Sequence, residues 1–467
     1  FAERTKKSDL IIETYVSCFS DSEKNQFHSE LFLIPEFQKP TFDYPGYIQS
    51  LDIVNYEEAI KTWIHVIWEN YSPKHQKFNA SYVGICKKII GNMIFNRSKG
   101  LISLKMSRDE QDNTYYLDIV AKSGIHHRLS KLQKLELCYN VTRNNNAELI
   151  VDRIVNLFTI LTRNVRSLQH ITIIFGTENQ NLQSRFGKSL ADLIKSQTNL
   201  EYLELYKFWD SSTASSIYSA LVAQSHSLNY LKILGTKDFV QLLPFLRNCT
   251  NLKTLCITPS IPSTWEDSGA KYSSIELEHI YFQQYAEPNM ITSTLIPILR
   301  MSGQNLRTLS LQMVNIEHLD FIAQHCSNIT TLSLNIAHFQ LSHFGEIISN
   351  MSLRSLTLKK VLEDTTFDLS SIIELARSIP NSLKYFGIGF KMSPVTMELF
   401  LSECRASLYG LDLYYYFNMI NDSYLRVFIQ YSRDNHSFRQ LRFEDAPSTH
   451  LCGIFENPSK LLQYTKT

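Results

Sequence analysis

Apolar residues recur along the chain in one short pattern, L-x-x-L-x-L, in which Ile or Phe can replace Leu. The clear copies are Leu132-Leu135-Leu137, Leu168-Ile171-Ile173, Leu200-Leu203-Leu205, Leu228-Leu231-Ile233, Leu252-Leu255-Ile257, Leu277-Ile280-Phe282, Leu306-Leu309-Leu311, Ile329-Leu332-Leu334, Leu353-Leu356-Leu358, Leu383-Phe386-Ile388, Leu408-Leu411-Leu413 and Phe438-Leu441-Phe443. Two weaker copies precede them, Ile48-Leu51-Ile53 and Leu101-Leu104-Met106. From position 101 to 438 the pattern advances in twelve steps, a mean period of about 28 residues. A chance run of apolar residues would not keep this register, so we predict internal repeats.

Segments in which apolar residues have helical spacing lie between these copies. Examples are 189–194, 239–246, 295–299, 372–376 and 397–401. Each repeat is therefore expected to be one short strand followed by one helix. Such a unit cannot bury its apolar side alone, so neighbouring units stack. The predicted fold is an α/β leucine-rich-repeat solenoid, a horseshoe with a concave parallel sheet and convex helices.

Small polar residues stand directly before the first apolar position of most copies. They are Ser167, Asn199, Ser227, Asn251, Asn305, Asn328, Ser352, Ser382, Ser407 and Ser437. Such residues favour a tight turn that leads into a strand.

The two ends of the chain depart from the repeat pattern. Residues 1–46 are expected to form an N-terminal helix over Asp9–Val16 and a proline-punctuated, extended linker. The solenoid is expected to span 47–445, and 446–467 to form a C-terminal cap or tail.

Within the solenoid, residues 47–100 are expected to be atypical, irregular cap repeats, because terminal repeats need a different outer surface. Two helices are predicted there, over Tyr56–Tyr71 and Ser81–Phe95. A Pro- and Gly-containing insertion at 259–274 interrupts the array.

Composition and charge narrow the range of partners. The 467 residues are 44% apolar and 19% charged, the balance of a globular chain. The net charge of +1 supplies no field for nucleic acid or an anionic membrane, so neither is an expected partner.

The eight cysteines lie far apart, without zinc or disulfide spacing, and are interpreted as reduced, mostly buried thiols. The sequence shows neither a signal peptide nor an apolar run long enough to cross a membrane. We therefore expect a cytoplasmic or nuclear protein. Because Phe1 is no initiator Met, we expect the chain to start partway through a longer one.

Candidate chemistry is sparse. No nucleophile elbow, zinc-protease motif, phosphate-binding loop or C-x-x-C occurs, so no catalytic, cofactor-binding or metal residue is assigned and no enzyme is expected. The pair Gly387 and Gly389 favours tight packing or a flat patch of sheet over phosphate binding. His126-His127 favours a surface turn over a metal site, because adjacent side chains point apart. Glu57-Glu58 is interpreted as the start of a helix, where acidic residues favour the positive end of the dipole.

The remaining functional signal is on the concave sheet, where the variable positions of the pattern point to solvent. The predicted partner-binding residues are Tyr202, Glu204, Tyr206, Tyr230, Lys232, His279, Tyr281, Tyr385, Asp412, Tyr414 and Arg442. The middle repeats carry small hydroxyl residues at these positions: Thr308, Ser310, Thr331, Ser333, Ser355 and Thr357. Exposed tyrosines suit interface anchors. Tyrosine and threonine are also favoured in strands for their shape alone, so both interpretations stand.

Three runs carry a resemblance to a known family: Asn251-Leu252-Lys253-Thr254-Leu255, Asn305 to Leu311, and Cys326 to Leu334. They resemble the Cys/Asn-containing repeats of F-box leucine-rich-repeat proteins. The N-terminal layout is similar to the expanded fungal set of that family, in which a helix like Leu10–Ser20 follows the F-box and a segment like Tyr47–Ile53 opens the repeats. The resemblance covers nearly the whole chain.

The resemblance implies a substrate receptor of a cullin-RING ubiquitin ligase, in which the F-box binds a Skp-type adaptor and the repeats bind a protein substrate on the concave face. No Leu-Pro-x-Glu type helix occurs between Phe1 and Pro45, and Ile34-Pro35-Glu36 is isolated. We therefore expect any F-box, and with it adaptor binding, to lie upstream of Phe1.

Three functions remain open. The chain is a non-catalytic protein-binding scaffold that recognises a substrate for ubiquitination, or a general leucine-rich-repeat interaction scaffold without a link to ubiquitin. An enzyme would need a catalytic constellation in the 259–274 insertion or the N-terminal cap, and the sequence offers none there.

Overall fold

The computed structural model describes most of the chain. The described residues are 2–31, 38–71, 81–107, 115–120, 123–140, 146–209, 211–236, 242–259, 275–282, 288–312, 314–336, 341–360, 368–414, 421–444 and 453–456. They group into two compact units, Phe1–Lys232 and Ile233–Thr467. The predicted domain boundaries at 46 and 445 remain predictions, and most of the insertion predicted at 259–274 lies outside the described residues.

Among the described residues of the first unit, five short strands follow the repeat pattern. They are β1 (Ser50–Asp52), β2 (Ser103–Ser107), β3 (Lys134–Asn140), β4 (His170–Gly176) and β5 (Tyr202–Trp209). Each pairs in parallel with the next, in chain order. A further strand, β6 (Tyr230–Thr236), starts at the end of this unit.

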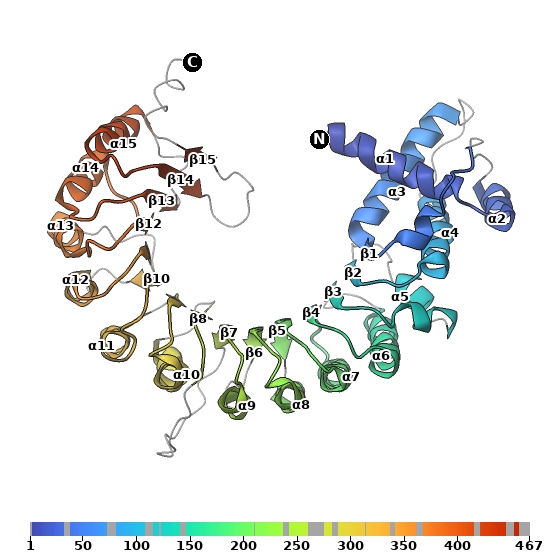
Figure 1. Ribbon diagram of the computed structural model, residues 1–467, viewed down its shortest axis with the longest axis horizontal. Helices are drawn as coiled ribbons and strands as arrows, with labels where there is room; N and C mark the ends of the chain where they lie inside the picture. Colours follow the sequence, from blue (N-terminus) through green and yellow to red (C-terminus); the bar gives the residue numbers. More distant parts are fainter. Residues whose placement is uncertain are drawn as a thin grey trace. The chain divides into compact units, whose positions relative to one another are not determined.

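The helices of the first unit alternate with these strands. They are α1 (Ala2–Ser17), α2 (Asp21–Leu31), α3 (Ile53–Tyr71), α4 (Ser81–Arg97), α5 (Tyr115–Val120), α6 (Ala147–Asn164), α7 (Gln180–Ser196) and α8 (Ser211–Leu221). Three short 3-10 helices accompany them: η1 (Tyr44–Tyr47), η2 (Ser123–Arg128) and η3 (Val222–Gln224). Figure 1 shows α6, α7 and α8 on the same side of the strands that they follow.

The second unit continues the alternation. Its strands are β7 (Thr254–Pro259), β8 (His279–Phe282), β9 (Thr308–Leu311), β10 (Thr331–Ile336), β11 (Ser355–Lys360), β12 (Tyr385–Gly389), β13 (Gly410–Tyr414), β14 (Gln440–Glu444) and β15 (Gly453–Glu456). Its helices are α9 (Leu243–Asn248), α10 (Pro288–Ser302), α11 (Ile316–His325), α12 (Leu341–Ser349), α13 (Leu369–Ser378), α14 (Pro394–Glu403) and α15 (Asp422–Asp434).

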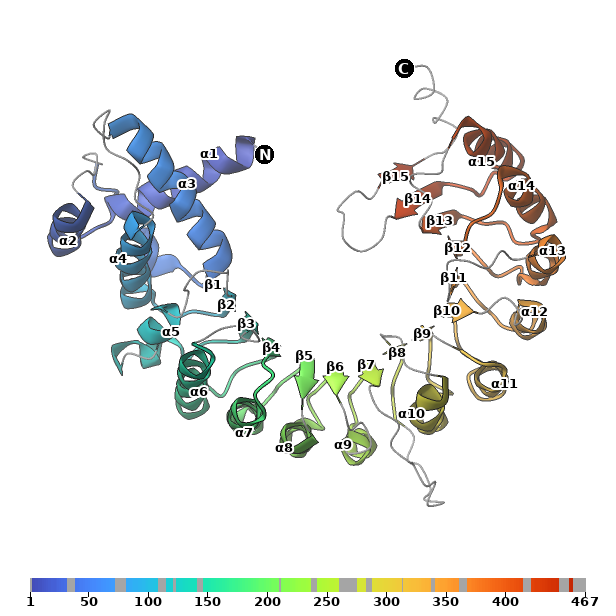
Figure 2. The ribbon, with the colours of Figure 1, turned by 180° about the vertical axis from the view of Figure 1, so that it is seen from behind.

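Strands β7 to β14 pair in parallel with their neighbours, and β15 pairs antiparallel with β14. Seen from behind, α10 to α15 again lie on one side of the strands (Figure 2). Strands in chain order with helices on one face are the leucine-rich-repeat architecture, so this prediction is confirmed.

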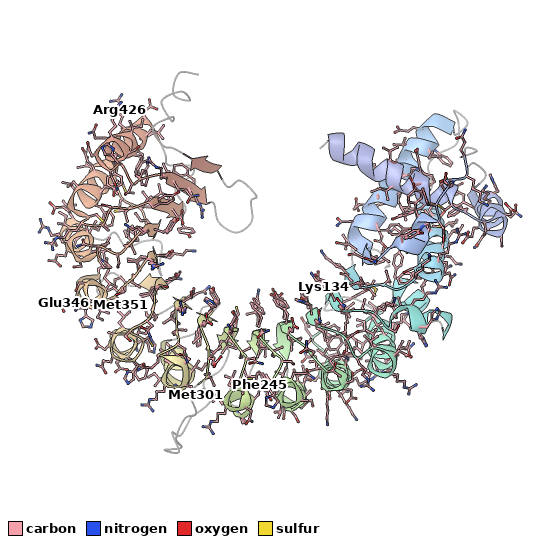
Figure 3. The ribbon with its side chains drawn as sticks, in the orientation of Figure 1. Lys134, Phe245, Met301, Glu346, Met351 and Arg426 are labelled. Carbon is pink, nitrogen blue, oxygen red and sulfur yellow. The ribbon has the colours of Figure 1, made fainter. Side chains whose placement is uncertain are left out.

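The apolar positions of the pattern build the core because the register places them side by side. Leu332 is aligned with Leu356, and Leu356 with Phe386. All three side chains are buried. The helices contribute the other wall, as at Phe245 of α9, which is buried and lies on the strand side of its helix (Figure 3). Alternation along the strands therefore separates a buried face from an open one.

Four of the serines that precede these copies also connect neighbouring repeats. The hydroxyls of Ser167, Ser227, Ser382 and Ser437 donate to the carbonyl oxygens of Leu132, Leu200, Leu353 and Leu408, the first apolar residue of the preceding copy, at 2.7–3.0 Å. From the sequence, these residues were interpreted only as turn formers. The structure shows that the hydroxyl satisfies a backbone acceptor of the adjacent repeat.

The N-terminal segment contains a helix that the sequence analysis missed. The predicted linker contains α2 and η1 instead of being extended throughout. Ser20 and Glu23 form a capping box at the start of α2, in which each accepts the other's backbone N–H. The spacing S-x-x-E was the overlooked signal.

Arg97 connects this segment to α4. Its guanidinium donates to the carbonyl oxygen of Cys18 at 2.6 Å and pairs with the carboxylates of Glu23 and Asp43. One side chain thus joins the end of α1, the start of α2 and the approach to η1.

The interpretation of Glu57 as a helix-start residue was wrong. Helix α3 begins at Ile53, so Glu57 lies beyond the first turn, and its carboxylate is buried. It pairs with the Lys87 ammonium of α4 at 3.1 Å. The acidic residue serves a buried ion pair between two helices, and only Glu58 is exposed, where it pairs with Lys61.

No helix among the described residues is long and apolar enough to span a membrane.

Candidate protein-binding surface

We call the face of the sheet that is turned away from the helices the open face. All eleven predicted partner-binding residues lie on it, at alternate positions of β5, β6, β8, β12, β13 and β14, and none of them is buried. Figure 3 shows Lys134, which shares a register row with His170 and Tyr202, on this side of the strands. Whether these residues bind a partner stays a prediction.

Five of the predicted residues form one group in the first unit, which we call the tyrosine cluster: Tyr202, Glu204, Tyr206, Tyr230 and Lys232. The hydroxyl of Tyr202 donates to Glu204 Oε1, that of Tyr230 donates to the same oxygen at 3.3 Å, and that of Tyr206 donates to Oε2 at 3.1 Å. Lys232 Nζ lies 3.8 Å from Oε1. One carboxylate therefore collects three phenol hydroxyls and an ammonium group.

The rings of the tyrosine cluster are stacked. Tyr202 and Tyr230 stack with centroids 4.3 Å apart and an interplanar angle of 9°. His170 of β4 lies on the other side of Tyr202, with centroids 5.4 Å apart. The Lys232 ammonium lies 4.7 Å from the centroid of the Tyr206 ring. Aromatic stacking and cation–π contact add stability beyond the buried area, typically about 0.5–1.5 kcal/mol for a ring pair.

Burial and the carboxylate keep the phenols of Tyr202 and Tyr206 protonated. Burial, and then the hydrogen bond to the Glu204 carboxylate, raise the pKa of Tyr202 well above its usual range. Burial also raises the pKa of Tyr206, and the interaction of its hydroxyl with the Lys232 ammonium offsets part of that rise. Tyr202 and Tyr206 are therefore neutral phenols, not phenolates.

Charged residues on the open face of β1, β2 and β3 are paired with one another. Lys105 Nζ lies 3.2 Å from Asp52 and 3.9 Å from Glu136, and Lys134 Nζ lies 2.7 Å from Glu136. These pairs are about half exposed on the lysine side, so each contributes little to stability. Asp52 and Glu136 therefore each have a lysine as counter-charge on the open face.

A second group lies on the open face of the second unit, around β12. The Lys359 ammonium lies 4.1 Å from the centroid of the Tyr414 ring, across the intervening strand. Gly389 permits this contact, because a Cβ there would lie 2.8 Å from Lys359 Cγ. A Cβ at Gly387 would lie 3.1 Å from Tyr414 Cε2. The packing role predicted for the two glycines is confirmed.

Other predicted residues of the second unit take part in separate contacts. Tyr385 meets Tyr409 edge to face, with centroids 5.5 Å apart. Arg442 Nε lies 3.9 Å from Asp412 Oδ1. His279 and Tyr281 lie on β8, and the hydroxyl-bearing strands β9 to β11 separate them from β12. They therefore do not belong to the second group, around β12.

Sequence reasoning missed two residues of these groups: His170 and Lys359. His170 and Lys359 occupy variable positions of the same strand pattern, and His170 is aligned with the predicted residue Tyr202. The periodicity was a sufficient signal for their exposure. Their contacts could not be predicted from the sequence, because the residues that they contact lie at least 32 residues away along the chain.

The described residues contain no group of three or more His, Cys, Asp or Glu side chains that could hold a metal ion. His126 and His127 lie in η2, the short turn-like helix, consistent with the structural interpretation of that pair.

The comparisons with known proteins give likenesses of fold. No family model matches the sequence, and no curated protein matches it. Among solved structures, Rad7 in its complex with Elc1 from yeast is similar over 96% of this chain and 91% of that chain, with 13% identity and a TM-score of 0.38. The leucine-rich-repeat protein LegL7 from Legionella pneumophila is similar over 77% of this chain and 96% of that chain, with 12% identity and a TM-score of 0.36. Likenesses this distant indicate nothing about function. The contacts described above establish a leucine-rich-repeat fold with an ordered aromatic group on its open face.

Proposed function

We propose that this chain is a non-catalytic scaffold whose open face binds another protein, with the tyrosine cluster as the anchor. The supporting observation is that one mostly buried carboxylate holds three tyrosines from two strands in a single arrangement. Tyrosine contributes a large, rigid contact area at low entropic cost, and such residues dominate binding energy at interfaces.

The more specific form of this proposal is substrate recognition for a cullin-RING ubiquitin ligase in the cytoplasm or nucleus. Its support is the sequence resemblance of the repeats to F-box leucine-rich-repeat proteins. Adaptor binding through an F-box upstream of Phe1 is part of the same proposal. The alternative is a general interaction scaffold that holds its partner without ubiquitination.

A photo-crosslinking experiment tests the general proposal. A benzoylphenylalanine replaces Thr172, which is aligned with Glu204 on the adjacent strand and takes no part in the hydrogen bonds of the cluster. The matched control replaces Val222 of η3, an exposed apolar residue. Irradiation in cells of the source organism is expected to give one specific adduct from position 172, identified by mass spectrometry. Capture from position 222 alone would place the binding surface elsewhere and contradict the proposal.

The ubiquitin link has its own test. Full-length protein from the native source is expected to co-purify with a Skp-type adaptor, and the protein captured at position 172 is expected to become ubiquitinated in its presence. Absence of the adaptor, together with a stable captured partner, would favour the general scaffold.

A further inference from the structure

The geometry of the tyrosine cluster points to a role for Glu204 that rests on the proposed function and deepens it. We propose that Glu204 is a positioning residue: its carboxylate fixes the rings of Tyr202, Tyr206 and Tyr230 in the single arrangement that the partner contacts.

The strand places the donors around this carboxylate. Tyr202 and Tyr206 lie two residues before and two residues after Glu204 on the same face of β5. Both rings must therefore lean along the strand, in opposite directions, for their hydroxyls to reach it. Tyr230 approaches from β6. A side chain at position 204 with less accepting capacity would leave at least one of these rings without its restraint.

A carboxylate suits this position better than other side chains. Three hydroxyls donate to it, and an ionised carboxylate has two oxygens that only accept. A glutamine amide would offer one accepting oxygen and an NH₂ group that points donors at the phenols. Hydrogen bonds to an ionised acceptor are also roughly twice as strong as those between neutral groups.

The cluster is neutral overall, so it exerts little long-range electrostatic attraction on a charged partner. The Glu204 and Lys232 side chains are only 13% and 16% exposed and lie 3.8 Å apart, so the lysine offsets the carboxylate. We therefore expect partner binding here to depend on contact geometry, with only weak dependence on salt.

The test uses the full chain and two readouts. Glu204→Gln keeps the size of the side chain and removes accepting capacity, and Tyr206→Phe keeps one ring and removes its hydroxyl. Glu201→Gln is the matched control, since Glu201 lies directly before β5 and bonds only to Asn199 Nδ2 among the described side chains. The first readout is ring order, measured by crystal structures and by NMR of ¹³Cζ-labelled tyrosine. The second is the crosslinking yield from position 172.

In Glu204→Gln, the three rings are expected to leave their common arrangement, and the crosslinking yield is expected to fall about tenfold. Tyr206→Phe is expected to free one ring and to lower the yield less, while Glu201→Gln changes neither readout. Rings that keep their places in Glu204→Gln, or rings that move without loss of yield, would overturn the positioning role. If the unsubstituted cluster captures nothing from position 172 but its rings move in Glu204→Gln, the proposed function fails while the positioning of the rings by Glu204 is supported.

Discussion

At the scale of single residues, Gly389 has the most sharply defined requirement. A Cβ at this position would lie 3.1 Å from Lys359 Cα, which is backbone and cannot move aside as a side chain can. We expect Gly389→Ala to destabilise the protein by about 1–3 kcal/mol, the usual cost of overpacking. Urea denaturation measures the change, and a crystal structure should show the Lys359 ammonium displaced from the Tyr414 ring.

Gly84 provides the matched control for that substitution. It lies inside α4, and a Cβ there would meet nothing within 4 Å. Gly84→Ala is therefore expected to stabilise the helix by up to about 1 kcal/mol. Equal effects of the two substitutions would show that close packing at Gly389 is not the cause.

His318 makes the stability of the protein depend on pH. It is fully buried at the third position of α11, where its Nδ1 accepts the backbone N–H of Asn315 at 3.3 Å. Burial lowers its pKa from 6.5 to about 4. Between these two values the unfolded chain binds a proton that the folded chain does not, so stability falls as pH falls from about 6.5 to about 4.

The substitution His318→Gln tests this dependence. Glutamine serves equally well at this position of a capping box, so the helix start is kept while the titrating group is removed. Urea midpoints at pH 7.5 and pH 5.0 are expected to differ less in this variant than in the parent protein. His325→Gln, an exposed histidine of the same helix, is the control and should leave the difference unchanged.

At the scale of repeat elements, the serine hydroxyls that bridge consecutive repeats should contribute measurable stability. Ser382 Oγ donates to the Leu353 carbonyl at 2.7 Å. Ser382→Ala leaves that acceptor without this donor, and we expect a loss of about 1 kcal/mol in unfolding free energy. Ser352→Ala is the control, because Ser352 holds the same place in the preceding repeat without a side-chain hydrogen bond among the described residues. A similar loss in both variants would point to helix or turn propensity instead.

The accuracy of element prediction depended on how much of the signal was local. Helices α3 and α4 match the predicted ranges within a few residues, because their apolar spacing spans several turns. Helix α2 was missed because its apolar residues are few, so that its capping box was the main sign of it. Burial of Glu57 was also missed, since its partner Lys87 lies on another helix.

At the scale of the whole molecule, the reactivity of the described cysteines measures how well the core excludes solvent. Seven are free, and Cys86, Cys249 and Cys326 are among the buried ones. Burial raises the pKa of Cys249 and of Cys326 to about 12, so few thiolates form at neutral pH.

We therefore expect iodoacetamide at pH 8 to leave Cys86, Cys249 and Cys326 unmodified in the native protein. In about 6 M urea, which unfolds most domains, it should modify all three thiols fully. Peptide mass spectrometry measures each site. The half-exposed Cys138 is the internal comparison and should react first. Modification of Cys326 at the rate of Cys138 would show that the native core opens far more readily than its packing indicates.

The strand pattern, the repeat period and the exposure of positions such as Tyr202 and Tyr414 were determined by the sequence alone. Each follows from alternation between neighbouring residues, which is a local property of an extended chain. The contacts among those side chains were decided only by the tertiary structure. Glu204 collects the hydroxyl of Tyr230 from the next repeat, and Lys359 reaches Tyr414 across a strand because a glycine lies between them. Such contacts depend on register and side-chain direction, which stacking sets between residues far apart in the chain.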